Sequence, residues 1–330
     1  TQNKGETYNR VGIPGATVYD LAISKNSKGY QLLAGTDSNT YRTALPVLKK
    51  VDSTTLEWGA TEGEGRFGEK VLQIASSPTE PNVVYKIRKS WTGINVYRSK
   101  DGGQNWDLKF EDDSVPLDML VHPANPNEIV IPYYIPASSE TGVWISQDGG
   151  ENWKKIKQEH KFTAIAGDPK DPNRIWAGGN DGLFLSKDMG QSFQKIQNVP
   201  VSSIAIDSNN SNHLVVGGTH LYVSTDGGKT LEKAKYAGFE LDMFVNDIIV
   251  SPSNPNVIYA ATGSFKQRGL LKGGRGVLMS VDGGVTWTNI SEGLDNKNTT
   301  ALVLSPDEEY LFVGTQGGSV KRIKLPKKQR

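Results

Sequence analysis

The sequence predicts an all-β fold of seven repeated antiparallel units, because two patterns recur along its 330 residues. One is an octapeptide with Ser first, Asp third, Gly fifth and an aromatic residue or Leu last. The other is an apolar strand, a turn rich in Pro and Asn, and a second apolar strand. The octapeptide Asp residues lie 47, 40, 38 and 56 positions apart, which indicates a repeat architecture. They are Asp101, Asp148, Asp188, Asp226 and Asp282.

Each octapeptide has the residues of a hairpin turn. In one copy, Ser146 ends a strand, and the Asp148 carboxylate can accept backbone N–H bonds from the turn that follows it. Gly149 and Gly150 supply positive φ without steric cost. Trp153 begins the next strand and can pack between neighbouring sheets. We therefore expect the five Asp residues to be structural, not reactive.

The unit of two apolar strands occurs seven times, and its Asn-Pro turns are typical of hairpins. Followed by a third strand, the octapeptide and an outer strand, each unit makes four strands, which is typical of a propeller blade. The first apolar strands begin near Val18, Val71, Pro116, Phe162, Val201, Val245 and Thr299.

The two ends of the chain complete each other in this interpretation. The first unit has a degenerate passage, residues 40–58, where others have the octapeptide, and the last unit stops after its third strand, residues 319–325. Residues 1–15 precede the first unit, so we expect them to supply the missing outer strand and close the ring, which removes open sheet edges. The prediction is a single seven-bladed β-propeller over residues 1–330, of four-stranded antiparallel blades, with a basic tail at 326–330.

The amino-acid composition argues against several classes of partner and cofactor. Lys and Arg number 37 and Asp and Glu 36, so the net charge of +1 argues against a nucleic-acid-binding protein. No apolar run is long enough to span a membrane. The absence of cysteine excludes thiol catalysis and thiolate metal sites, and the four His residues show no metal-ligand spacing. We expect no metal, no cofactor, no nucleic acid and no membrane span.

The start at Thr1, without a Met, is typical of a mature chain whose signal segment has been removed. We therefore expect an exported protein, which is extracellular, periplasmic or at the cell surface. Its partner is expected to be a protein or a glycan, and the chain could be a subunit of a larger extracytoplasmic assembly.

The octapeptide is the motif called the Asp box, or BNR repeat, so the chain resembles the Asp-box β-propellers. That group includes sialidases, xyloglucanase-type endoglucanases, sortilin-type receptor domains and the photosystem II assembly factor. Asp-box proteins are usually secreted, which agrees with the expected export. The resemblance is specific for the fold, but the same propeller hosts unrelated activities.

The expected blade topology predicts where a site lies. All octapeptides join third to outer strands, so they share one face of the disc. The loops from second to third strands, and from outer strands to the next inner strand, share the opposite face around the channel mouth, where loops can vary on a rigid scaffold. From those loops we select nine binding residues: Asp37, Tyr41, Arg42, Arg88, Trp91, Tyr133, Tyr134, Phe265 and Arg268.

Exposed aromatic rings among hydrogen-bonding groups suit two kinds of ligand. The apolar face of a pyranose stacks on a ring, and Tyr, Trp and Arg supply hot spots in protein interfaces. Tyr133 and Trp91 could equally end buried strands.

Two functions follow from the resemblance. Xyloglucanase-type enzymes carry Thr-Asp-(Val/Ile)-Gly-Gly-x-Tyr-Arg with a catalytic Asp in the first blade. The stretch from Thr36 matches at Asp37, Tyr41 and Arg42 but lacks the Gly-Gly pair, and those enzymes take a second carboxylate from a second propeller. Asp37 is thus the catalytic candidate of a secreted glycoside hydrolase, xyloglucanase-like or, from a faint Arg-Ile-Pro echo at residues 10–14, sialidase-like.

Sortilin-type domains and the photosystem II assembly factor work without chemistry. Because the chain shows no assembled catalytic set, we favour a non-catalytic recognition or assembly module that binds a protein or glycan through the face opposite the Asp boxes, with no catalytic residue assigned. The glycoside hydrolase is the alternative.

Overall fold

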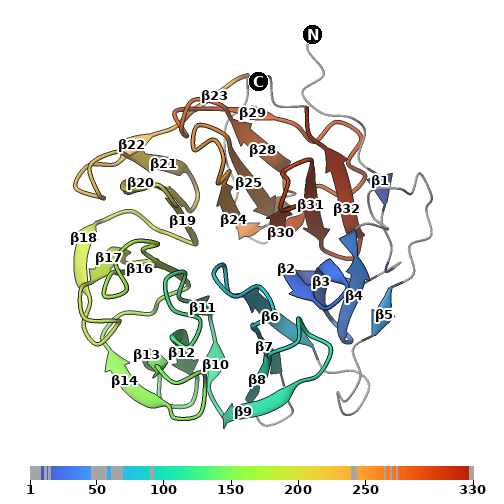
Figure 1. Ribbon diagram of the computed structural model, residues 1–330. Helices are drawn as coiled ribbons and strands as arrows, with labels where there is room; N and C mark the ends of the chain where they lie inside the picture. Colours follow the sequence, from blue (N-terminus) through green and yellow to red (C-terminus); the bar gives the residue numbers. More distant parts are fainter. Residues whose placement is uncertain are drawn as a thin grey trace.

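The molecule is a ring of seven antiparallel sheets, called blades 1 to 7 in chain order (Figure 1). Every element with described bounds is a β-strand, which confirms the predicted all-β propeller. The computed structural model describes residues 9–10, 13, 16–45, 58–60, 70–89, 93–238, 244–263, 265–267, 270–272 and 274–326.

The inner and second strands of each blade form the apolar hairpins expected from the repeat. The inner strands are β2 (Val18–Asn26), β6 (Val71–Ser76), β10 (Val115–Pro116) with β11 (Leu120–Val121), β15 (Ala164–Gly167), β19 (Ser203–Asp207), β24 (Phe244–Val250) and β30 (Thr299–Leu304). The second strands are β3 (Gly29–Thr36), β7 (Val84–Lys89), β12 (Ile129–Ile135), β16 (Ile175–Gly179), β20 (Asn210–Gly217), β25 (Ile258–Gly263) and β31 (Tyr310–Thr315).

The third and outer strands complete the blades. The third strands are β4 (Thr40–Ala44), β8 (Ile94–Ser99), β13 (Glu140–Ser146), β17 (Gly182–Ser186), β21 (Leu221–Ser224), β28 (Gly276–Ser280) and β32 (Ser319–Lys324). The outer strands are β5 (Gly59–Ala60), β9 (Asp107–Asp112), β14 (Lys154–Gln158), β18 (Gln194–Gln197), β22 (Glu232–Lys233), β29 (Thr286–Asn289) and, for blade 7, β1 (Asn9–Arg10).

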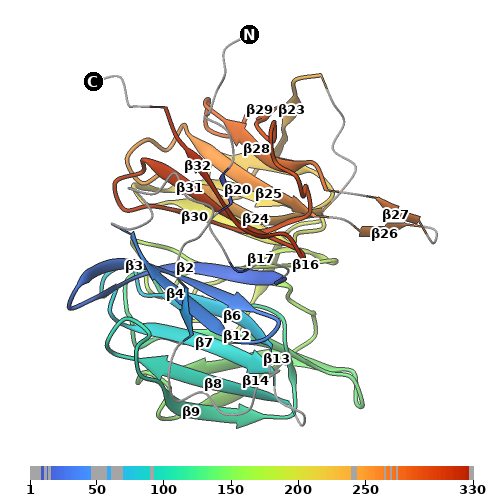
Figure 2. The same ribbon diagram turned by 90° about the vertical axis from the view of Figure 1, so that its right-hand side faces the viewer.

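Blade 6 carries two additions. Strand β23 (Lys235–Tyr236) runs parallel to β29 at its outer edge. A hairpin of β26 (Phe265–Gln267) and β27 (Leu270–Lys272) is inserted between β25 and β28, and Figure 2 shows it projecting from the body of the molecule.

The ring closes through the N-terminal strand, as predicted. Asn9 pairs with Arg322 and Arg10 with Lys321, so β1 is the antiparallel outer strand of blade 7. Chain segments from both ends thus share one sheet, and the third strand of blade 7 is covered by a partner strand.

The apolar core lies between the blades. Buried apolar residues form seven clusters, and each cluster joins two neighbouring blades. The octapeptide aromatics take part, as expected: the Trp153 ring stacks on Phe110 of blade 2 at 4.8 Å, and Trp287 is fully buried against blade 5. Blade-to-blade burial therefore makes the ring one cooperative unit.

The octapeptides adopt the predicted turn. In blade 3, Asp148 Oδ1 accepts the backbone N–H of Asn152 at 2.9 Å and the Ser146 hydroxyl at 2.9 Å. The Ser146 hydroxyl oxygen accepts the N–H of Gly150 at 2.8 Å, and Gly149 and Gly150 have φ of 79° and 93°. Hydrogen bonds from Asn152 lower the pKa of Asp148 to about 2. The carboxylate is occupied by its own turn, so its role is structural.

Every octapeptide is also bonded to the turn between the first two strands of its own blade. The donor is the backbone N–H after the Asp, and the acceptor is the carbonyl of an Asn in that turn or, for Asn212 in blade 5, at the start of the second strand. These bonds place both kinds of turn on one face of the ring, called the Asp-box face. The pairs are Gly102 to Asn82, Gly149 to Asn127, Met189 to Asn173, Gly227 to Asn212 and Gly283 to Asn256, at 2.8–3.1 Å.

Candidate functional site

The face opposite the Asp-box face carries the second-to-third strand loops and the connections between blades. We call it the loop face. Figure 1 shows the inner strands around the centre of the ring, where they line a channel. Six of the nine sequence-selected residues have described side chains and lie in loop-face connections or adjacent strand ends: Asp37, Tyr41, Arg42, Arg88, Tyr133 and Tyr134.

In blade 1, the β3–β4 turn holds Asp37 beside the entry of the first inner strand. The Asp37 N–H donates to the Thr17 carbonyl at 3.2 Å, and the Thr17 N–H approaches Asp37 Oδ2 at 3.4 Å. Asp37, Tyr41 and Arg42 are all half-buried. The turn therefore brings these three residues to one end of blade 1, while their catalytic or binding role stays a prediction.

Arg88 and Tyr133 are buried, with 4% and 0% of their surfaces exposed. The Tyr133 hydroxyl donates to Glu140 Oε1 at 2.9 Å, and burial raises the pKa of Tyr133 well above its ordinary value. This burial supports the alternative interpretation that Tyr133 ends a buried strand. Trp91, Arg268 and the side chain of Phe265 lie outside the described residues.

Tyr134 is half-buried at the end of β12 and faces a lysine. The Lys161 ammonium lies 4.1 Å from the centre of the Tyr134 ring, a cation–π contact between blade 3 and the connection to blade 4. Close by in sequence, His160 Nδ1 lies 3.1 Å from Asp181 Oδ2. The fold thus joins an aromatic ring and charges from different loops.

Glu140 is held by two lysines of the outer strand. Its Oε1 lies 2.9 Å from Lys155 Nζ and its Oε2 lies 2.6 Å from Lys157 Nζ. Hydrogen bonds from Lys157, Lys155 and Tyr133 lower the pKa of Glu140 to about 2. We call Tyr133, Glu140, Trp144, Lys155 and Lys157, which share one face of the sheet, the blade 3 cluster; Tyr134 lies on the other face.

Sequence reasoning missed four members of this cluster. Lys155 and Lys157 lie opposite Trp144 and Gly142 in the β13–β14 ladder, so their spacing of two puts them on one side of the sheet. The alternation of side chains along the outer strand could have grouped Lys155 with Lys157. It could not have linked them to Glu140, because that link depends on how β13 and β14 are aligned.

Three carboxylates reach into the central channel: Asp20, Asp118 and Asp247 line one cavity of about 440 Å³. Asp20 Oδ2 accepts the backbone N–H of Ile74 in the next blade at 3.0 Å. In the same way, Asp118 accepts a backbone N–H from the inner strand of blade 4, and Asp247 accepts one from the inner strand of blade 7. These further bonds are Asp118 Oδ2 with Ile165 at 2.8 Å and Asp247 Oδ2 with Leu302 at 2.7 Å.

A strand irregularity makes these clamps possible. The register shifts between Val18 and Asp20, and between Val245 and Asp247, so one residue of each inner strand bulges out of the ladder. The bulged Asn246 donates to the Thr299 carbonyl of the next blade at 2.8 Å. Bulges at the same place in other inner strands, and polar side chains, also connect other pairs of neighbouring blades.

Side chains of the inner strands cross all seven junctions between blades. The remaining junctions are bridged by Gln73 Nε2 to Asp118 Oδ1 at 2.8 Å, Thr163 Oγ1 to the Val201 carbonyl at 3.3 Å, Ser202 Oγ to the Val245 carbonyl at 2.7 Å, and Thr300 Oγ1 to the Val18 carbonyl at 2.6 Å. The channel wall is therefore a closed polar ring that holds the loop face rigid.

The channel carboxylates were not selected from the sequence. Asp20 and Asp247 occupy the same place in their repeats, two residues after Val18 and Val245, and Asp118 follows Pro116 by the same distance. This repeat alignment was the signal. Burial raises the pKa of Asp20 to about 8, of Asp118 to about 6 and of Asp247 to about 7.

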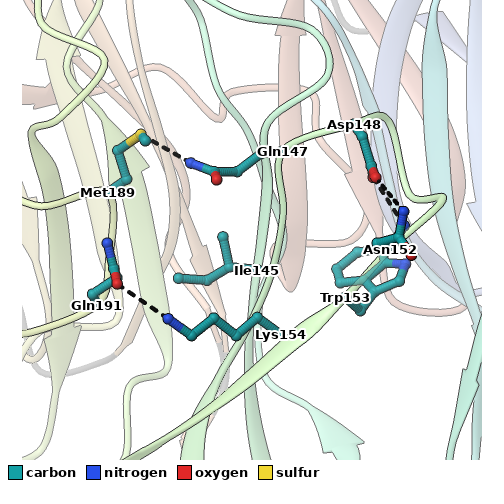
Figure 3. Close-up of a pocket in the computed structure, with 8 residues that line it drawn as sticks. All are labelled: Ile145, Gln147, Asp148, Asn152, Trp153, Lys154, Met189 and Gln191. Carbon is teal, nitrogen blue, oxygen red and sulfur yellow. Dashed lines mark hydrogen bonds between the residues drawn. The ribbon is translucent and has the colours of Figure 1, made fainter.

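A cavity of about 330 Å³ lies between blades 3 and 4 on the Asp-box face (Figure 3). Gln147 Nε2 donates to Met189 Sδ at 3.1 Å, and Lys154 Nζ donates to Gln191 Oε1 at 3.2 Å. Figure 3 shows Ile145 between these two bridges. The polar groups of the cavity already bond one another, so this gap serves blade packing.

Among the residues that the structure describes, no group of three or more His, Cys, Asp or Glu side chains could hold a metal ion. No helix within them is long and apolar enough to cross a membrane.

The family model for the BNR/Asp-box repeat matches residues 144–155, which span the blade 3 octapeptide. The chain is 26% identical over 325 residues to a xyloglucanase of Hypocrea jecorina (strain QM6a). That alignment covers 94% of this chain and 35% of the relative, so the chain spans about a third of the relative's length.

Solved structures share the fold. A GH74 xyloglucanase from Xanthomonas campestris superimposes with a TM-score of 0.69 at 15% identity, over 96% of this chain and 53% of that one. YCF48 bound to a D1 peptide superimposes with a TM-score of 0.65 at 13% identity, over 99% of this chain and 96% of that one. With five octapeptides on one face of seven four-stranded blades, the chain is an Asp-box, or BNR-repeat, β-propeller protein.

Proposed function

We propose that this propeller is a non-catalytic recognition module that binds a protein partner through its loop face. The observation that carries the proposal is the contact beside blade 3 in which the Lys161 ammonium lies over the half-buried ring of Tyr134. Within the described residues, Lys161 makes no ion pair, so its charge is available to a ligand. An aromatic ring beside a cation is typical of an interface hot spot.

The scaffold supports this proposal because it holds the loops in fixed positions. Seven polar junctions and seven apolar clusters connect the blades, so a ligand meets a preorganised surface. A preorganised surface loses little conformational entropy on binding, which favours affinity.

The comparisons favour a protein partner over a glycan for a propeller of this size. The YCF48 structure, matched over nearly its whole length, contains a bound D1 peptide. The xyloglucanase structure is matched over about half of its length. We propose on this basis that the chain works by binding a segment of a protein, and could do so within a larger extracytoplasmic assembly.

A glycoside hydrolase is the second candidate, because the xyloglucanase similarity extends over 94% of the chain. Asp37, Tyr41 and Arg42 would then lie at the site. Glycosidases use two carboxylates on opposite sides of the scissile bond, and the relative is about three times as long as the matched segment. The second carboxylate would have to come from outside this propeller.

The location of the protein is part of the proposal. Similarity to an enzyme named for a polysaccharide supports an exported protein that works outside the cytoplasm.

A binding screen tests the first candidate. The immobilised chain is exposed to a peptide array and, separately, to xyloglucan, and the double variant Tyr134→Ala, Lys161→Ala is compared with Lys154→Ala. We expect the wild type to bind a peptide. The double variant should bind that peptide at least about tenfold more weakly, and the Lys154→Ala control should keep the wild-type affinity. Equal binding by wild type and double variant, or binding of xyloglucan alone, contradicts the proposal.

A hydrolysis assay tests the second candidate on the same preparation. Release of reducing ends from xyloglucan that disappears in Asp37→Asn would establish the hydrolase. No release, together with peptide binding, would leave the recognition module.

A further inference from the structure

Buried carboxylates usually have a cationic partner, because an isolated charge loses its hydration. The three channel carboxylates do not. Within the described residues, Asp20, Asp118 and Asp247 make their hydrogen bonds to backbone N–H groups and to the Gln73 amide, and none of them forms an ion pair.

All three face the same cavity of about 440 Å³, so like charges are brought together in a confined space. The cavity's other titratable group is Tyr19, whose ring has Lys70 Nζ 5.8 Å from its centre. The charges of Asp247 and Asp118 act on Asp20 and raise its pKa further. Charge repulsion across the channel therefore opposes ring closure when the carboxylates are ionised.

We propose that the three channel carboxylates make closure of the propeller ring sensitive to pH, and that protons bound in the channel tighten the ring. The cavity already contains an acceptor for such a proton: Gln73 Oε1 is buried and receives no hydrogen bond from the described residues. A protonated carboxyl can donate its O–H while its other oxygen still accepts a backbone N–H.

The direction of the effect follows from the pKa values. Burial raises the pKa of Asp118, Asp247 and Asp20 to about 6, 7 and 8, from an ordinary value of 3.8. Folding thus binds protons near neutral pH. The stabilisation is fully present below about pH 4 and is lost as the pH rises from there through the folded pKa of each group; over that interval each group changes the folding equilibrium by up to about tenfold per pH unit.

Other blades show which neutral residues fit at this place in the repeat. Gln73, Ala164 and Ala301 occupy the position in blades 2, 4 and 7. Asp247→Ala and Asp20→Gln therefore copy residues that the ring already accommodates, and they are milder than a change to a residue foreign to the repeat.

The test is urea unfolding of the full chain at about pH 5.0, 6.5 and 8.0, which covers the interval in which the channel carboxylates release their protons. We expect the wild-type midpoint to fall as the pH rises, and the fall to shrink in Asp247→Ala and Asp20→Gln. Glu232→Gln is the control, since Glu232 is an exposed carboxylate on the outer strand of blade 5, outside the channel cavity, and this variant should keep the wild-type pH dependence.

Comparing each variant with wild type removes the contribution of other titrating groups, such as His122, whose pKa is lowered by burial. Should a variant fail to fold, infrared spectroscopy of Glu128→Gln gives the answer, because protonated carboxyl groups have a distinct C=O band and this variant lacks the Glu128 carboxyl outside the channel, whose pKa burial also raises. We expect that band to persist at pH 6.5. Its absence there, or an unchanged pH dependence in both folded channel variants, overturns the proposal.

Discussion

The Thr300 hydroxyl donates a 2.6 Å hydrogen bond to the carbonyl oxygen of Val18, across the junction where the last blade meets the first. The two residues are 282 positions apart in the chain. Together with the β1–β32 pairing, this bond completes the ring of inner-strand contacts. Ring closure therefore depends on a polar contact in the channel wall as well as on the outer strand.

Thr300→Val tests this contact, because Val keeps the shape of Thr but cannot donate. The Val18 carbonyl would lose its side-chain donor, so we expect unfolding free energy to fall by about 1–2 kcal/mol. Urea denaturation measures this. Thr288→Val, on the outer strand of blade 6, is the control, since its 3.3 Å bond to Met279 lies within one blade. Equal losses of unfolding free energy in both variants would show that the hydrogen bond at the ring closure contributes no more than a bond within one blade.

Acid should loosen the Asp boxes. The carboxylates of Asp148 and Asp226 accept bonds from their own turns, chiefly from Asn152 and Thr230, and these bonds lower the pKa of both to about 2. A lowered pKa gives stability that is present above about pH 4 and lost as the pH falls toward 2. We expect the melting temperature to drop steeply as the pH falls through that range.

Asp148→Ala is the matching variant. It should lower the melting temperature at pH 7, lose part of the acid transition and leave partner affinity unchanged, because the box lies on the face opposite the proposed site. A variant that is fully stable but does not bind would contradict the structural assignment of the boxes.

Met189 stands where four other octapeptides have Gly, and its φ is 58°. A β-branched residue is strained in this left-handed region, so Met189→Val should reduce unfolding free energy by about 1–3 kcal/mol. Met189→Gly should be tolerated within about 1 kcal/mol, since relief of strain offsets the lost side-chain contacts. Chemical denaturation of the two variants decides this, and the reverse order would show that Met189 is retained for its packing.

Two adjacent tyrosines should behave in opposite ways. Tyr133 is fully buried, so Tyr133→Ala should destabilise by about 3–5 kcal/mol, as for other large core residues. Tyr134 is half-buried under Lys161, so Tyr134→Ala should change the melting temperature little and weaken partner binding. Thermal denaturation and binding measured on the same samples check both. A Tyr134→Ala variant that melts like Tyr133→Ala would place both rings in the core.

The fold could be predicted from the sequence because each repeat carries its own local signals. Ser146, Asp148 and Gly150 define a turn through contacts no more than four residues apart, and that turn forms as expected. The unpaired ends of the repeat pattern likewise predicted the pairing of β1 with β32.

The candidate site could be predicted only in part. Asp37, Tyr41 and Tyr134 come from loops that the repeat pattern placed on one face. Lys161 was missed because its contact with Tyr134 depends on the path of the chain from blade 3 to blade 4, which local pattern does not specify.

By itself, the sequence determined the number of blades, the turn chemistry and the way the ring closes, because these depend on short-range hydrogen bonding and strand alternation. Only the tertiary structure decided that Asp20, Asp118 and Asp247 share one cavity. The reason is geometric: residues 98 and 129 positions apart become neighbours only when the blades curve into a ring, and burial there raises the pKa of each carboxyl.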